Sequence, residues 1–139
     1  MPDMTDLLDR LRPVALNAWR IILGFTFFTH GGQKLLGWFG RDAVAEVVSL
    51  RGVAGILEFF GGLAILVGLQ TRPVAFVLSG QMAVAYWYQH AGNGGPWHWE
   101  NGGELAAVYC LSFLAMSAVG GGDFSVDGFI ERRRSDGSR

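Results

Sequence analysis

The sequence predicts an all-α protein, an integral membrane four-helix bundle whose N- and C-termini are both cytoplasmic. Half of the 139 residues are hydrophobic and only 17% are charged, and the mean hydropathy is +0.29. A soluble domain of this size needs more charged surface, because its outer face must stay hydrated. Apolar residues also occupy every face of the expected helices, whereas a soluble helix shows a polar stripe. The alternative is a soluble bundle whose helices are all buried.

The apolar segments divide the chain into an N-terminal segment (1–12), a four-helix domain (13–119) and a hydrophilic C-terminal tail (120–139). Pro13 suits the first turn of a helix, where its missing N–H is not needed. A polar connection follows the first span, and we expect a short amphipathic helix at about 43–50. The four spans are expected at about residues 13–36, 52–69, 73–89 and 104–119.

The distribution of basic residues predicts the orientation of these spans. One side would carry most of them, namely Arg10, Arg12, Arg72, Arg132, Arg133, Arg134 and Arg139. The opposite side would carry Lys34, Arg41 and Arg51. Cytoplasmic loops are enriched in Lys and Arg, so both termini are expected in the cytoplasm. The first apolar run is too long for a signal peptide and lacks a small-residue cleavage site. We therefore expect a multi-pass protein of a bacterial plasma (inner) membrane.

The composition excludes several classes of function. A formal net charge of −1 provides no global basic field for nucleic acid. The single cysteine, Cys110, excludes a dithiol mechanism within this chain. No metal-type Cys pair, HxxxH-type spacing or phosphate-cradling glycine loop is present, so no metal, haem or flavin is indicated.

Ionisable residues inside the spans are the main functional signal. A charge in the hydrocarbon region costs roughly 2.5–3.5 kcal/mol, so it should face the bundle interior and have a partner. On the first span, Arg20 shares a stripe with Asn17, Gly24 and Gly31. His30 and Lys34 lie four residues apart, near the end of this span.

The second span carries Glu58, followed at helical spacing by Gly61 and Gly62. Glycines at these positions would let another helix approach the carboxylate. With the topology above, seven ionisable side chains are expected to converge on the extracytoplasmic end, namely His30, Lys34, Glu58, His90, His98, Glu100 and Glu104.

Four of these residues are the candidates for proton transfer or polar contacts with a ligand, namely His30, Lys34, Glu58 and Glu104. Gln81 and Tyr88 are expected to line the interior from the third span. The full set of expected ligand-binding residues is Arg20, Gly31, Gly61, Gly62, Gln81, Tyr88, His90, His98 and Glu100. No metal ligands are expected.

Each candidate also has a structural interpretation. Lys34 could extend only to the interface, and Arg20 could form an ion pair with Glu58, although their depths differ by roughly 10 Å or more. Glu104 could only favour a helix N-terminus through the macrodipole. His90 and His98 fit solvated loop residues, and the tryptophans beside His98 fit membrane anchors.

The chain resembles the DoxX family, four-helix membrane proteins named after a subunit of a thiosulfate:quinone oxidoreductase. The resemblance covers about residues 14–127 and is carried by residues 20–35, 58–62, 68–69, 71–72, 101–104 and 120–127. It implies a four-helix membrane bundle. For function it implies a mixture: subunits linked to quinone reduction, partners of membrane-bound thiol-redox or oxidative-stress complexes, and many members of unknown activity.

Three functions remain open. The leading hypothesis is a membrane redox protein, a quinone-linked oxidoreductase subunit with a polar pocket on the extracytoplasmic side. Reduction of a quinone takes two electrons and two protons, so the pocket would supply protons, and a partner redox subunit or soluble oxidoreductase would supply electrons. The alternatives are a non-catalytic scaffold that recruits redox or stress proteins, and a small transporter. The lipid bilayer is an expected partner, small residues on the helices favour a homo-oligomer, and no nucleic-acid partner is expected.

Overall fold

The computed structural model describes residues 3–44 and 46–137, and this part of the chain is helical and contains no strand. The all-α prediction is therefore confirmed. The chain divides into two compact units. Unit 1 comprises Met1–Thr71 and Gly120–Arg139, and unit 2 comprises Arg72–Val119.

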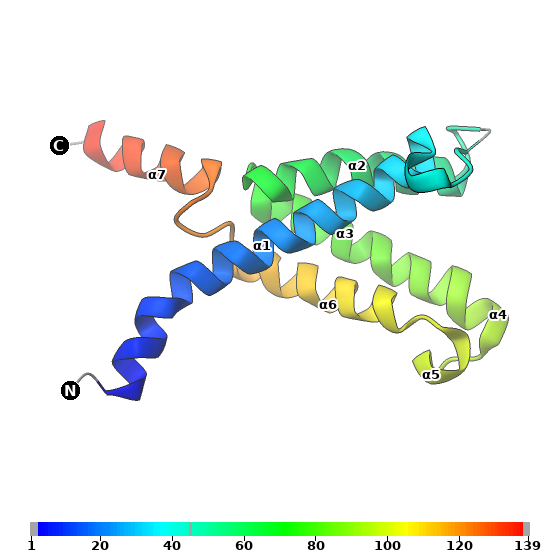
Figure 1. The fold of residues 1–139 in the computed structure, drawn as a ribbon, viewed down its shortest axis with the longest axis horizontal. Coiled ribbons are helices and arrows are strands. Elements are labelled where there is room, and N and C mark those ends of the chain that lie inside the picture. The colour runs from blue at the N-terminus through cyan, green and yellow to red at the C-terminus, as the bar shows by residue number, and fades with distance from the viewer. Residues whose placement is uncertain (1–2, 45, 138–139) are drawn as a thin grey trace. The chain divides into compact units, whose positions relative to one another are not determined.

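Helix α1 (Met4–Leu36) opens unit 1 and is longer than the first predicted span (Figure 1). The Asp3 side chain accepts a hydrogen bond from the Met4 N–H at 2.6 Å and so caps the helix. Pro13 lies inside the helix rather than in its first turn. A proline inside a helix removes one backbone hydrogen bond and bends the axis, and α1 is bent in its N-terminal half (Figure 1). The helix ends at Gly37, which adopts a left-handed conformation (φ 69°).

The connection after α1 differs from the prediction. A 3₁₀ turn, η1, covers Trp38–Gly40. The amphipathic helix expected at about 43–50 is absent from the described residues of that range, which form irregular and turn structure before α2 begins at Leu50. The Ser49 side chain accepts a hydrogen bond from the Gly52 N–H at 3.0 Å and fixes the start of the next helix. The segment between η1 and this cap is too short to form an independent helix, because the first helical turn costs conformational entropy for only one hydrogen bond.

Helix α2 (Leu50–Val67) packs antiparallel against α1 through glycines of both helices. A Cβ atom on Gly31 of α1 would collide with the backbone of Phe59, and one on Gly62 of α2 would collide with the backbone of Phe28. The two backbones can approach this closely only because both positions lack a side chain. The stripe of small and polar residues on α1 is therefore the contact face with α2.

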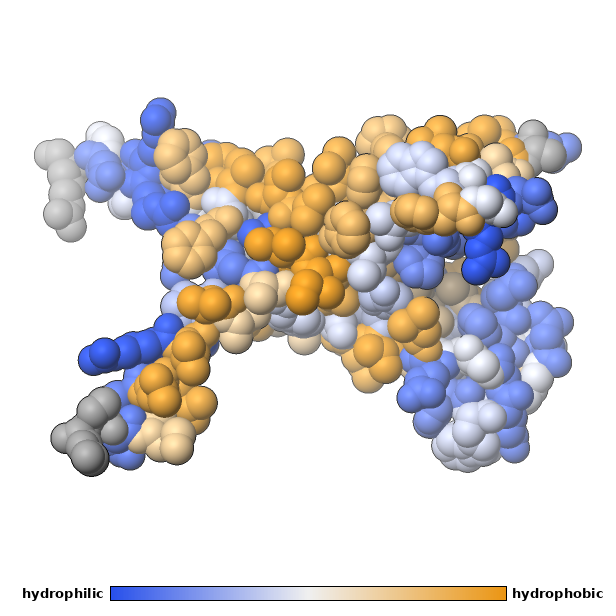
Figure 2. All heavy atoms as spheres, in the orientation of Figure 1, coloured by the Kyte–Doolittle hydropathy of each residue, from blue (hydrophilic) through white to orange (hydrophobic). Residues whose placement is uncertain are grey.

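Among the described residues, α2 is the one helix long and apolar enough to cross a membrane, and α6 (Glu104–Val119) is apolar but shorter. Figure 2 shows a hydrophobic surface along α2 and the middle of α1. On α1, large apolar side chains such as Ile22 and Phe25 are more than half exposed. Unit 1 therefore presents an apolar surface around a small polar interior.

The predicted hydrophilic tail contains a helix, α7 (Val126–Gly137). Its first turn is built by Ser125, whose side chain accepts a hydrogen bond from the Gly128 N–H at 3.0 Å. Figure 2 shows that much of α7 is hydrophilic on the visible face. Within the described residues, the tail up to Gly137 thus folds as part of unit 1.

Unit 2 contains most of α3 (Thr71–Val84), followed by a π-helical segment, η2 (Ala85–Ala91). Two short helices, α4 (Gly92–Gly94) and α5 (His98–Asn101), form the loop that leads to α6. The Ser79 hydroxyl donates a hydrogen bond to the carbonyl oxygen of Cys110 at 2.8 Å and links α3 with α6. The Tyr86 hydroxyl donates to the carbonyl oxygen of Pro96 at 2.7 Å and holds the loop against η2.

Candidate functional site

The central feature of the candidate site is an ion pair between α1 and α2. The Nζ atom of Lys34 lies 2.5 Å from Oε1 of Glu58. The carboxylate side chain is 3% exposed, whereas the lysine side chain is 29% exposed. A buried carboxylate is stable only with a charged or hydrogen-bonding partner, and Lys34 provides one. The structure therefore joins two of the four predicted catalytic residues and assigns Lys34 a partner other than the membrane interface.

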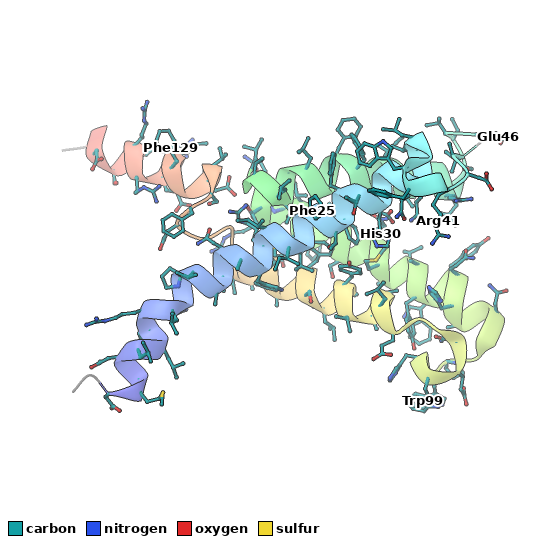
Figure 3. The ribbon with its side chains drawn as sticks, viewed as in Figure 1. Phe25, His30, Arg41, Glu46, Trp99 and Phe129 are labelled. Atoms are coloured by element: carbon teal, nitrogen blue, oxygen red, sulfur yellow. The ribbon has the colours of Figure 1, made fainter. Side chains whose placement is uncertain are left out.

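The segments α1, η1 and α2 also carry a histidine, glycines and a cluster of aromatic rings. His30 is half-buried on α1, one helical turn before Lys34 (Figure 3). Gly31 is buried and Gly61 is half-buried. The rings of Phe28, Trp38 and Phe59 pack against one another with centroids 4.6–5.7 Å apart. The partly exposed side chain of Lys34 leaves the ion pair accessible from one side.

A second polar cluster surrounds Arg20, which is 2% exposed. Its guanidinium donates hydrogen bonds to the carbonyl oxygens of Ile65 (3.0 Å) and Leu66, in the last turn of α2. It also donates to the carbonyl oxygen of Phe124 (3.1 Å) and to Oδ1 of Asn17 (3.4 Å). The last carbonyls of a helix lack partners within the helix and carry a partial negative charge. Arg20 therefore caps α2, and the alternative in which it pairs with Glu58 is wrong.

Asp127 completes this cluster from the start of α7. Its two carboxylate oxygens accept hydrogen bonds from the backbone N–H groups of Gln70 and Thr71, each at 2.8 Å. Its own N–H donates to the carbonyl oxygen of Gly68 at 2.9 Å. One side chain therefore caps the start of α3 and fixes α7 to the end of α2. The contacts of this Arg20–Asp127 cluster therefore hold the ends of α2, α3 and α7 together.

Sequence reasoning placed Arg20 on a polar stripe but did not find Ser125 and Asp127 as its companions. The available signals were the Asn17–Arg20 spacing and the polar motif after Gly120–Gly122. These motifs are more than 100 residues apart, and the Arg20 acceptors are mainly backbone carbonyls. No pattern of side-chain types identifies such partners.

The remaining predicted ligand-binding residues belong to unit 2. Gln81 is half-buried on α3, whereas Tyr88 is 66% exposed, and the prediction that both line the bundle interior stays a prediction. Tyr88 lies in the π-helical segment, in which the hydrogen bonds span one residue more than in an α-helix and the following side chains shift to another face.

The loop residues of unit 2 are mainly at the surface. Nδ1 of His90 lies 3.2 Å from the carbonyl oxygen of Asn101. His98, Glu100 and Glu104 are exposed. Trp99 on α5 (Figure 3) stacks on Trp97 with centroids 5.2 Å apart. The convergence of these loop residues with the Lys34–Glu58 pair stays a prediction.

Comparison with known proteins identifies the family. The sequence model of the DoxX family matches residues 15–91, more than half of the chain. The protein belongs to the DoxX family. The DoxX chain is 37% identical over 127 residues to an uncharacterised protein of Haemophilus influenzae, covering 86% of this chain and 93% of the relative. It is also 27% identical over 134 residues to the inner membrane protein YqjF of Escherichia coli, covering 91% and 99%. No solved structure matches the chain.

The family and the YqjF relative, together with the apolar helix α2, support a bacterial inner-membrane protein. A protein of this kind is associated with the lipid bilayer. The predicted class, a membrane protein, is thereby supported.

Proposed function

We propose that this DoxX protein is a multi-pass membrane protein in which α1, α2, α3 with η2, and α6 each cross the bilayer. Both termini would lie in the cytoplasm. Large apolar side chains on the outer faces of the helices support this arrangement, for example Phe25 on α1, Phe76 on α3 and Leu111 on α6, each more than half exposed. A soluble protein rarely leaves so much contiguous apolar surface in water. The basic residues of the α2–α3 turn and of α7 fit the cytoplasmic side.

Within this arrangement, the Lys34–Glu58 pair would be the functional centre of a membrane redox protein that acts on a quinone or a similar lipid-soluble carrier. The single observation that carries this proposal is a buried carboxylate bonded at 2.5 Å to a lysine that is itself partly exposed. Charged residues inside membrane spans are costly and rare, and they usually mark a functional site.

The residues around the pair fit a quinone headgroup. Small-molecule sites combine apolar and aromatic walls with a few polar groups that fix orientation. Apolar side chains of α1 and α2 would provide the wall, and the ammonium group of Lys34 would donate a hydrogen bond to a carbonyl oxygen. A bound quinone would supply two-electron, two-proton chemistry, with electrons from a partner redox protein.

The role of this chain's own residues would be to hold and supply protons. Lys34 would donate one proton to a quinone oxygen, and Glu58, which shares a hydrogen bond with it, would take up a proton from water and return it to the lysine. His30, one turn away, is the candidate for the next proton carrier. These roles need no electron carrier within the described residues.

The test uses the full-length protein purified in mild detergent, with native mass spectrometry and an absorbance spectrum of the same sample. We expect bound quinone in the wild type and at least a tenfold loss in Glu58→Gln and Lys34→Met. Glu131→Gln is the matched control, because Glu131 is an exposed carboxylate on α7. A wild type that neither carries quinone nor binds an added short-chain quinone would refute the proposal.

A further inference from the structure

Helix α7 has an apolar face that is exposed to solvent. Val126, Phe129 and Ile130 lie at i, i+3 and i+4, which places them on one face. Their exposed fractions are 38%, 49% and 38%, and Phe124, just before the helix, is 71% exposed. Glu131 falls on the opposite face by helical spacing. A helix with one exposed apolar stripe requires either a partner or a lipid surface to cover it.

Three consecutive arginines extend and flank this stripe. Arg133 follows Ile130 at i+3, and its guanidinium carbon lies 4.7 Å from the centroid of the Phe129 ring. Arg132 donates a hydrogen bond to the carbonyl oxygen of Asp123 at 2.8 Å. Arg132 and Arg134 lie on the two flanks of the stripe by helical spacing. An apolar stripe with basic residues at its borders is typical of a helix that lies in the membrane interface.

The attachment of α7 places it at the right depth for such a role. Asp127 binds the backbone of Gly68, Gln70 and Thr71. Gly68 is the C-cap of α2, which is long and apolar enough to cross a membrane. The end of a spanning helix lies at the boundary between hydrocarbon and headgroups, so the first turn of α7 is held at this boundary.

We propose that α7 is an interfacial helix that binds anionic phospholipid headgroups of the cytoplasmic leaflet. Arg132, Arg133 and Arg134 contact the phosphates, and Phe129 and Ile130 insert at the acyl boundary. Charge complementarity favours lipid as the partner of this surface, because three adjacent guanidinium groups match the anionic headgroups of the cytoplasmic leaflet. The inference depends on the membrane-spanning arrangement and is independent of any quinone chemistry.

The first experiment measures lipid binding by the full-length protein. Phosphatidylglycerol and phosphatidylcholine are titrated separately and followed by native mass spectrometry. The triple variant R132Q/R133Q/R134Q should bind phosphatidylglycerol about tenfold or more weakly, because each basic residue near an anionic surface contributes roughly fivefold in affinity. The control R41Q/R51Q, altered at the exposed Arg41 of the α1–α2 connection and the exposed Arg51 in the first turn of α2, should bind like the wild type. Inorganic phosphate should not displace the lipid.

The second experiment measures insertion with an environment-sensitive dye in liposomes, in a Cys110→Ala background. A dye at Ile130→Cys should shift its emission to shorter wavelength in phosphatidylglycerol liposomes, and a dye at Ser135→Cys, on the opposite face, should not. Equal phosphatidylglycerol affinity of the triple variant and the wild type would overturn the proposal. The proposal would also be overturned if a soluble protein copurified with the wild type but not with the triple variant, while both bound lipid equally. In that case α7 would be a protein-docking surface.

Discussion

Replacing Arg20 with methionine should destabilise the protein strongly, although methionine is apolar and of similar length. Arg20 is 2% exposed and donates hydrogen bonds to three backbone carbonyls, those of Ile65, Leu66 and Phe124. A buried acceptor that loses its donor costs about 1–3 kcal/mol. Because the three carbonyls share one donor group and the new side chain restores some apolar contact, we expect a total loss of about 3–5 kcal/mol rather than the full sum.

The assay is thermal unfolding in detergent, followed by the loss of the monodisperse peak in fluorescence-detected size-exclusion chromatography. The expected decrease in Tm is on the order of 10 °C for a chain of this size. Arg72→Gln is the matched control, because Arg72 is exposed and its hydrogen bond to the carbonyl oxygen of Val119 is long, at 3.4 Å. An exposed interaction of this kind contributes about 1 kcal/mol or less.

Arg20→Lys separates charge from geometry. Lysine keeps the positive charge but lacks the planar fork that reaches several carbonyls at once, so its Tm should fall between those of the wild type and Arg20→Met. If Arg20→Met and Arg72→Gln have the same Tm, the helix-capping role of Arg20 is refuted.

Two further predictions concern the packing and capping of unit 1. Gly62→Ala should lower the free energy of unfolding by about 1–3 kcal/mol, because its Cβ would collide with the backbone of Phe28. Gly80→Ala, where a Cβ meets open space among the described residues, should be neutral in the same thermal assay. Equal Tm values for the two variants would contradict close α1–α2 packing. Asp127→Ala should lower the free energy of unfolding by about 1–2 kcal/mol, because α3 loses a helix cap. The release of α7 should also make proteolysis of the C-terminal tail faster than in Asp136→Ala, a control at an exposed site. Identical cleavage rates in the two variants would count against this cap.

The sequence determined the helical class because apolar side chains on every face indicate helices in lipid. It also placed the Asn17–Arg20 stripe and brought Lys34 and Glu58 to the same end of their helices, since helical rise alone fixes depth along an axis. The expected convergence of these two residues agrees with the ion pair, although the sequence analysis did not pair them directly.

Only the tertiary structure decided what Arg20 and Asp127 bind. Their partners are main-chain groups at Ile65, Phe124 and Thr71, and every residue carries such groups, so composition and spacing do not mark them. The π-helical turn that leaves Tyr88 exposed is likewise a departure from the 3.6-residue period on which the prediction relied. Side-chain periodicity reports which faces are apolar, whereas the free ends of helices become satisfied only by segments that the fold brings to them.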